Sequence, residues 1–151
     1  MSHRLHSSKL EILGLAATAK CFCEEFSERH HFEIEYHSED VPKELPPQIS
    51  LTLFRILQEA LQNAAKHSCS KQFRVLLRGS GNHIELTVRD SGKGFELENA
   101  IKSCGLGLAS MRERIKLVDG EILIESESQK GTTLRASVPV VFRNNSMHLV
   151  K

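Results

Sequence analysis

No apolar run in this sequence approaches the ~20 residues that a membrane-spanning helix needs. Residues 1–15 also lack the apolar core of a secretion signal. The four cysteines form no C-x-x-C pair, which argues against a zinc site and against a disulfide framework. The sequence also has no excess of one charge, because it contains 20 Lys and Arg and 19 Asp and Glu. The resulting formal net charge of +1 disfavours nucleic-acid binding. These absences predict a cytoplasmic domain without membrane contact or a nucleic-acid partner.

The composition is that of one soluble domain, since 151 residues with 40% hydrophobic and 26% charged side chains are enough to bury a core. Apolar residues at helical spacing predict helices at residues 14–29 and 108–118. Alternation of apolar and polar residues predicts strands at residues 31–36, 73–78, 83–89, 121–127 and 132–140. Turns are expected at residues 79–82 and at Lys130-Gly131.

The order of these elements indicates the fold class. The strands follow one another as hairpins and do not alternate strictly with helices. This order predicts an α/β (α+β) fold, a two-layer sandwich in which a mixed, mainly antiparallel sheet carries its helices on one face. A central helix is expected at residues 55–68, RILQEALQNAAKHS, after a break at the prolines in positions 42, 46 and 47.

Four polar side chains share one stripe of the central helix, namely Glu59, Asn63, Lys66 and His67. Their spacing of three and four residues places them within about 100° of the helix surface. Hard oxygen ligands suit Mg²⁺, and a lysine can neutralise phosphate charge, so the stripe is suited to a metal beside phosphates. The alternative is a solvated polar face, on which His67 could cap the C-terminus of the helix.

Two glycine-rich motifs follow the central helix. Residues 90–95, DSGKGF, begin at a strand end, where the Asp90 carboxylate can accept a hydrogen bond from an exocyclic amine. Residues 105–108, GLGL, open a helix, where exposed N–H groups at the positive end of the helix dipole can bind phosphate. Each motif alone is a weak signal, because the first could be a turn and the second a helix cap.

Together, in this order, the three motifs resemble the ATP-binding catalytic domain of bacterial sensor histidine kinases, which belongs to the GHKL superfamily with the Bergerat ATP-binding fold. The E-x-x-x-N of Glu59 and Asn63 resembles the N-box of that family, and the two glycine motifs resemble its glycine boxes. The stretches ALQNAAKHS, GLGLASMRERI and GTTLRASVP resemble the nitrate-sensor and desaturase-sensor type of kinase. The resemblance covers residues 8–140.

The resemblance implies an ATP and Mg²⁺ site with a role for each matching residue. Asn63 would coordinate Mg²⁺ and would form the catalytic pair with Glu59, which would orient solvent or metal. Asp90 would hold the adenine amine. The other implied contacts are Lys66 and His67 at the phosphates, Gly92 and Gly94 beside the base, Gly105, Leu106, Gly107 and Leu108 around the phosphates, and Thr132 or Thr133 near adenine through a water.

The function implied is transfer of the γ-phosphoryl group of ATP to a histidine outside this chain, in two-component signal transduction. The implied partners are the dimerisation and histidine-phosphotransfer domain of the same kinase and a response regulator. Residues 1–13 are expected to end the dimerisation helix and form the linker, residues 14–141 to form the catalytic domain, and residues 142–151 to form a tail. The kinase would be cytoplasmic here, within either a membrane-anchored or a soluble sensor.

Two other functions fit the same motifs. An anti-sigma-type serine kinase belongs to the same superfamily and would need no upstream helix. An ATP-binding sensor module without turnover would report nucleotide to a partner. Family acceptor histidines are followed by Asp or Glu, and none of the eight histidines in this sequence is.

Overall fold

The computed structural model describes residues 9–67, 71–90, 109–127 and 131–140. Two long helices and five strands lie in these ranges, and helical turns also occur at residues 9–13 and 109–116. The labelled elements are α2 (Leu15–His30), β1 (Glu33–Glu39), α3 (Pro47–His67), β2 (Gln72–Ser80), β3 (His83–Asp90), β4 (Glu121–Glu127) and β5 (Gly131–Pro139). None of the helices in the described ranges is both long and apolar enough to cross a bilayer.

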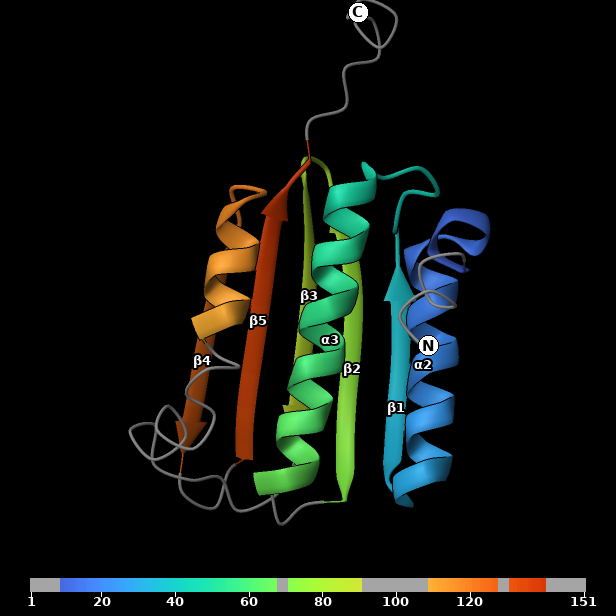
Figure 1. Cartoon of the computed structure of the whole chain (residues 1–151), viewed down its shortest axis with the longest axis vertical. Coiled ribbons are helices and arrows are strands. Elements are labelled where there is room, and N and C mark those ends of the chain that lie inside the picture. The colour runs from blue at the N-terminus through green and yellow to red at the C-terminus, as the bar shows by residue number, and fades with distance from the viewer. Residues whose placement is uncertain (1–8, 68–70, 91–108, 128–130, 141–151) are drawn as a thin grey trace, which may run out of the picture.

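The five strands form one sheet in the order β1-β2-β3-β5-β4. β1 and β2 are parallel, and the other three neighbouring pairs are antiparallel. The helices lie in a single layer over one face of this sheet (Figure 1). The predicted two-layer sandwich with a mixed, mainly antiparallel sheet is therefore confirmed.

The first predicted strand begins two residues later than expected, at Glu33. The reason is the end of α2, where His31 adopts the left-handed conformation at φ 58° and the Phe32 N–H donates to the Ser27 carbonyl at 3.1 Å. A hydrogen bond of this kind caps the C-terminal turn of the helix. The residues that form this cap cannot also start the strand. His31 and Phe32 therefore belong to the helix end, although their sequence alternates like a strand.

The central helix α3 is longer than the stretch predicted at residues 55–68, because it begins at Pro47. Proline is well tolerated in the first helical turn, where its missing N–H would have no intrahelical partner. The Pro46 carbonyl accepts hydrogen bonds from the N–H groups of Ile49 and Ser50 at 2.9 and 3.2 Å. The proline pair thus starts the helix directly rather than only breaking the chain before it.

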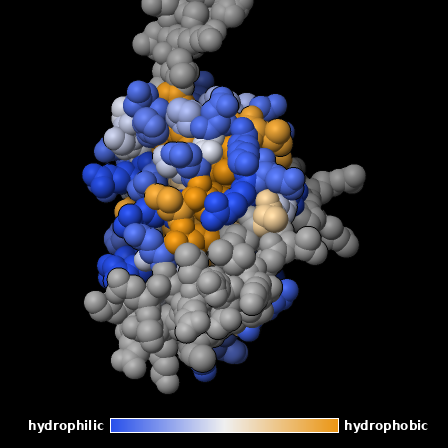
Figure 2. Space-filling view, turned by 90° about the vertical axis from the view of Figure 1, so that its left-hand side faces the viewer, coloured by the Kyte–Doolittle hydropathy of each residue, from blue (hydrophilic) through white to orange (hydrophobic). Residues whose placement is uncertain are grey.

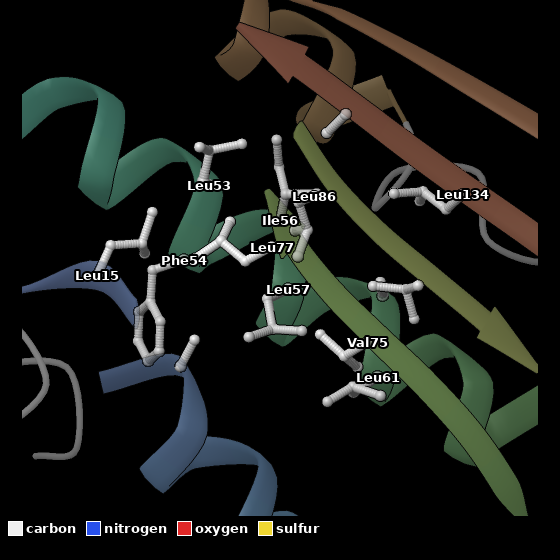
Figure 3. Packing of buried hydrophobic residues seen from close by; sticks show 14 of the residues in the cluster. Leu15, Leu53, Phe54, Ile56, Leu57, Leu61, Val75, Leu77, Leu86 and Leu134 are labelled. Atoms are coloured by element: carbon white, nitrogen blue, oxygen red, sulfur yellow. The ribbon is translucent and has the colours of Figure 1, made fainter. Parts of the chain in front are cut away.

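The hydrophobic core lies between the helix layer and the sheet. Figure 3 shows Leu57 and Leu61 of α3 close to Val75 of β2, with Phe54 turned toward Leu15 of α2. All five side chains are at most 4% exposed. Burial of this apolar surface is the main stabilising contribution, at roughly 25 cal/mol for each Å² removed from water.

The opposite face of the sheet is solvent-exposed and mostly charged. Residues of β2 and β3 alternate between buried positions and positions that are half-buried or exposed, as expected when only one face is covered. Exposed ion pairs join Arg74 to Glu35 at 3.5 Å and Arg135 to Glu125 at 3.8 Å. Apolar surface also gathers on the side formed by β4 and residues 109–116 (Figure 2), where Leu123 is 64% exposed.

Two acidic groups, the buried Cys23 thiol and the half-buried Tyr36 phenol, predict a loss of stability at alkaline pH. Burial, and secondly the Glu24 carboxylate, raises the pKa of the Cys23 thiol from 9.0 to about 12. Burial likewise raises the pKa of Tyr36 from 10.0 to about 12. Folding keeps both groups neutral to a higher pH than the unfolded chain does. Their stabilising contribution is therefore complete below pH 9 and is lost as the pH rises toward 12.

For Cys23 alone we expect the free energy of unfolding to fall by at most about 1.4 kcal/mol per pH unit in this window. The measurement is urea unfolding from about pH 8 to about pH 11 under reducing conditions. Cys23→Ala should flatten this slope. The matched variant Cys21→Ala should not, because that half-buried thiol keeps contact with solvent in the folded chain. Equal slopes in Cys23→Ala and the unmodified chain would contradict the assignment.

Candidate nucleotide-binding site

The ends of three secondary-structure elements meet at one end of the molecule. The C-terminal end of α3, the last residues of β3 and the first residues of β5 all lie there (Figure 1). α3 packs against both β3 and β5, and its C-terminal end lies at the end of the molecule where β3 ends and β5 begins (Figure 1). The predicted site residues in the described part of the chain come from these three elements.

Asp90 is the last residue of β3 and is only 6% exposed. It continues the buried alternation of Ile84, Leu86 and Val88, so it lies on the face of the sheet that the helices cover. Burying a carboxylate costs free energy unless polar groups surround it. Asp90 is therefore a polar position at the edge of an apolar core, as expected for a residue that recognises a ligand.

The start of β5 lies against Asp90. Thr133 pairs with Arg89 across the two strands, and both Thr132 and Thr133 are half-buried. Gly131, the first residue of β5, has φ +92°, and a Cβ atom added to it would meet the Asp90 carbonyl oxygen closer than 3.0 Å. The sequence placed Gly131 only in a turn. Its position between the predicted turn and the pair Thr132-Thr133 was the signal that the sequence offered.

The polar stripe of α3 flanks the buried face of that helix. Glu59 and Asn63 are half-buried, whereas Lys66 is exposed and His67 is the last residue of α3. Glu59 is eight residues before the helix end, at about 1.5 Å per residue, so it lies about 12 Å from His67 along the axis. Asn63 and Lys66 are thus nearer to the end of the molecule where Asp90 lies.

The remaining predicted ligands, Gly92, Gly94 and residues 105–108, lie outside the described residues. Among the residues that are described, no group of three His, Cys, Asp or Glu side chains gathers in a way that could hold a metal.

Residues 48–141 match the family described as histidine kinase-, DNA gyrase B- and HSP90-like ATPase. The match covers more than half of the chain, so this protein belongs to that ATPase family. The matched region includes all of α3 except its first residue, and also Asp90 and β5, which together form the described part of the candidate site. The resemblance expected from the sequence motifs is therefore confirmed, and ATP is the nucleotide that belongs to this family.

Within the family, the chain is similar to sensor histidine kinases. It is 33% identical over 140 residues to the oxygen sensor histidine kinase NreB of Staphylococcus carnosus. The aligned region covers 93% of this chain and 40% of NreB. The chain thus spans less than half the length of this relative.

Solved structures support the fold. The histidine kinase domain of a blue-light activated kinase from Erythrobacter litoralis superimposes with a TM-score of 0.71 at 18% identity, over 88% of this chain and 69% of that one. The catalytic domain of histidine kinase ThkA superimposes with a TM-score of 0.64 at 18% identity, over 83% of this chain and 89% of that one. The chain therefore has the fold of histidine kinase catalytic domains.

Proposed function

We propose that this domain transfers the γ-phosphoryl group of ATP to a histidine outside this chain, as the catalytic domain of a two-component sensor kinase. The observation that carries this proposal is the buried Asp90 at the end of β3, close to Gly131 at the start of β5, on a strand that packs against α3. A carboxylate that only accepts hydrogen bonds suits the exocyclic amine of adenine. The likeness to NreB supports the kinase reaction over other ATPase functions.

The roles of the side chains follow from their chemistry. Asn63 would hold Mg²⁺ through its amide oxygen, and Glu59 would orient water or the metal one turn earlier. Lys66 and His67, at the helix end, would face the phosphates. Thr132 or Thr133 would contact adenine through a water, and Gly92, Gly94 and residues 105–108 would approach the base and the phosphates.

Mg²⁺ would supply neutralisation of the phosphate charge as the phosphoryl group leaves. The protein would contribute positioning and electrostatic stabilisation, as in phosphoryl transfer generally. The half-buried amide of Asn63 fits a hard cation that keeps much of its water shell. Neither the charge neutralisation nor the positioning requires a nucleophile from the described part of this chain.

The partners follow from this reaction. The acceptor would be the dimerisation and histidine-phosphotransfer domain of the same kinase, and the phosphoryl group would pass on to a response regulator. We assign residues 1–13 to the end of the dimerisation helix and the linker, residues 14–141 to the catalytic domain and residues 142–151 to a tail. The helical turns at residues 9–13 support this division, since Ile12 and Leu13 there are 79% and 52% exposed. Such a domain would work in the cytoplasm, where ATP is available.

The first test is nucleotide binding followed by thermal unfolding. Mg-ATP at ~100 times its dissociation constant should add about 2.7 kcal/mol to the free energy of unfolding. This gain should raise the melting temperature by about 5–11 °C in a chain of this size, at roughly 2–4 °C for each kcal/mol. GTP should raise it less, because guanine presents a carbonyl where adenine presents the amine that Asp90 would hold.

Omitting magnesium is the matched control, and it should reduce the shift with ATP. The absence of any shift with saturating ATP and magnesium would contradict the proposed site. Equal shifts with ATP and GTP would contradict the role of Asp90 alone.

A further inference from the structure

The backbone contact between Gly131 and Asp90 is closer than any side chain allows. A Cβ atom at position 131 would lie closer than 3.0 Å to the Asp90 carbonyl oxygen, 3.1 Å from its carbonyl carbon and 3.3 Å from Oδ1. Real Cβ atoms essentially never show the first of these distances. The backbone of Gly131 also has φ +92°, which only glycine adopts freely. Steric contact and backbone conformation therefore both require glycine here.

This contact joins the two strands that carry the proposed adenine contacts. Thr133 pairs with Arg89, and Gly131 pairs with Glu127 on the other side of β5. β5 is thus held between β4 and β3 from Thr133 onward, two residues beyond Gly131. An added methyl group at position 131 would therefore have to change the separation between the start of β5 and Asp90, next to the paired threonine.

We propose that Gly131 is a positioning residue for adenine recognition. Because it has no side chain, β5 approaches the Asp90 backbone closely, and this approach fixes the depth and direction of the Asp90 carboxylate. The inference rests on the proposed function, since it specifies how the same site selects its base. Any substitution must change the separation of Gly131 and Asp90 by several tenths of an ångström or more, to restore ordinary contact distances, and this shifts Asp90 relative to the start of β5. Hydrogen bonds tolerate only a narrow range of distance and angle, so the bond to the adenine amine would be weakened.

The test is Gly131→Ala, with ADP and GDP titrated by calorimetry. ADP affinity should fall by about 10- to 100-fold, the range expected when a hydrogen bond to a charged group is lost. GDP affinity should change much less, so that the preference for adenine nearly disappears. A purely structural glycine would alter stability and leave the ratio of the two affinities unchanged.

Gly79 provides a matched control within the same sheet. A Cβ atom there would also meet a backbone carbonyl oxygen, that of Asp40, closer than 3.0 Å. Gly79 pairs with Ile84, whereas Asp90 pairs with Phe73, so the two sites lie six residues apart along β2. Gly79→Ala should lower the melting temperature and keep the adenine preference. Loss of the preference in both variants would overturn the inference, because general destabilisation would then explain it.

Two further measurements cover a variant that folds poorly. Gly131→Asn keeps the added Cβ atom but tolerates positive φ better than alanine, so it should fold better and still lose the preference. In the unmodified chain, amide exchange at residues 131–133 should slow with ADP more than with GDP. Retained adenine preference in a folded position-131 variant, or equal protection by both nucleotides, would overturn the inference. Failure of the unmodified chain to bind ADP would instead contradict the proposed function.

Discussion

Incubated alone with labelled ATP and magnesium, this chain should remain unlabelled, and phosphohistidine should appear only on a supplied acceptor domain. No histidine here is followed by Asp or Glu, as family acceptors are. His83 lies at the hairpin end of β3, opposite to Asp90, and His37 pairs with Glu35 at 3.2 Å on the exposed face of the sheet. Holding a nucleophile in line with its target gives effective concentrations of about 10⁵–10⁸ M, which a distant histidine lacks.

The assay supplies the dimerisation and phosphotransfer domain of a kinase of the same type, such as NreB, and tests the label for acid and base stability. Phosphohistidine is labile to acid and stable to base. Asn63→Ala with the same acceptor should reduce labelling by about 100-fold or more, because a metal ion contributes several kcal/mol to stabilisation of the transferring group. Gln62→Ala, which removes the exposed amide next to Asn63, is the matched control and should keep the rate.

Three results would separate the alternatives. Rapid labelling of a histidine in the isolated chain would contradict transfer to an outside acceptor. An acid-stable label on a serine of an added partner would favour the anti-sigma-type kinase. Tight Mg-ATP binding without transfer to any acceptor of this kinase type would favour a sensor module without turnover.

The fold could be predicted where burial follows a simple period. α2 and the strands β2 to β5 repeat apolar residues every 3.6 or every two positions, and they were found within a few residues of their bounds. The parallel pairing of β1 with β2 could not be predicted. The two strands are connected through α3 and not by a short turn, so their pairing depends on how that helix packs on the sheet. The starts of β1 and α3 were misplaced for local reasons, since the left-handed cap at His31 ends α2 later than the alternation suggested and Pro47 begins α3 instead of only breaking the chain.

The parts of the site that lie within a single sequence motif could be predicted. The spacing of Asn63 and Lys66 on one stripe is a property of any helix, and the structure places that stripe beside the buried face of α3. The burial of Asp90 also follows from the alternation along β3. The contact of Gly131 with Asp90 is different, because it joins residues 41 positions apart and exists only when β5 pairs with β3.

Asp90→Asn should reduce ATP affinity by about 10- to 100-fold, with and without magnesium, and should remove or invert the preference over GTP. Asparagine has nearly the same shape as aspartate, but it replaces one acceptor oxygen with an NH₂ donor. That donor would face the adenine amine unfavourably and the guanine carbonyl favourably. The expected loss is the same without magnesium because Asp90 would contact the base, whereas loss at Asn63 should depend on the metal.

The measurement is calorimetric titration of both nucleotides against Asp90→Asn and a control, Asp119→Asn. Asp119 is exposed, follows the helix at residues 109–116, and has φ 60°, a conformation that asparagine adopts readily. The control removes the same charge from the chain and should leave both affinities unchanged. If Asp90→Asn stayed folded and kept the full preference for ATP, recognition of adenine would have to come from another group, and the central role of Asp90 would be wrong. If it lost affinity only in the presence of magnesium, Asp90 would act on the metal instead of the base.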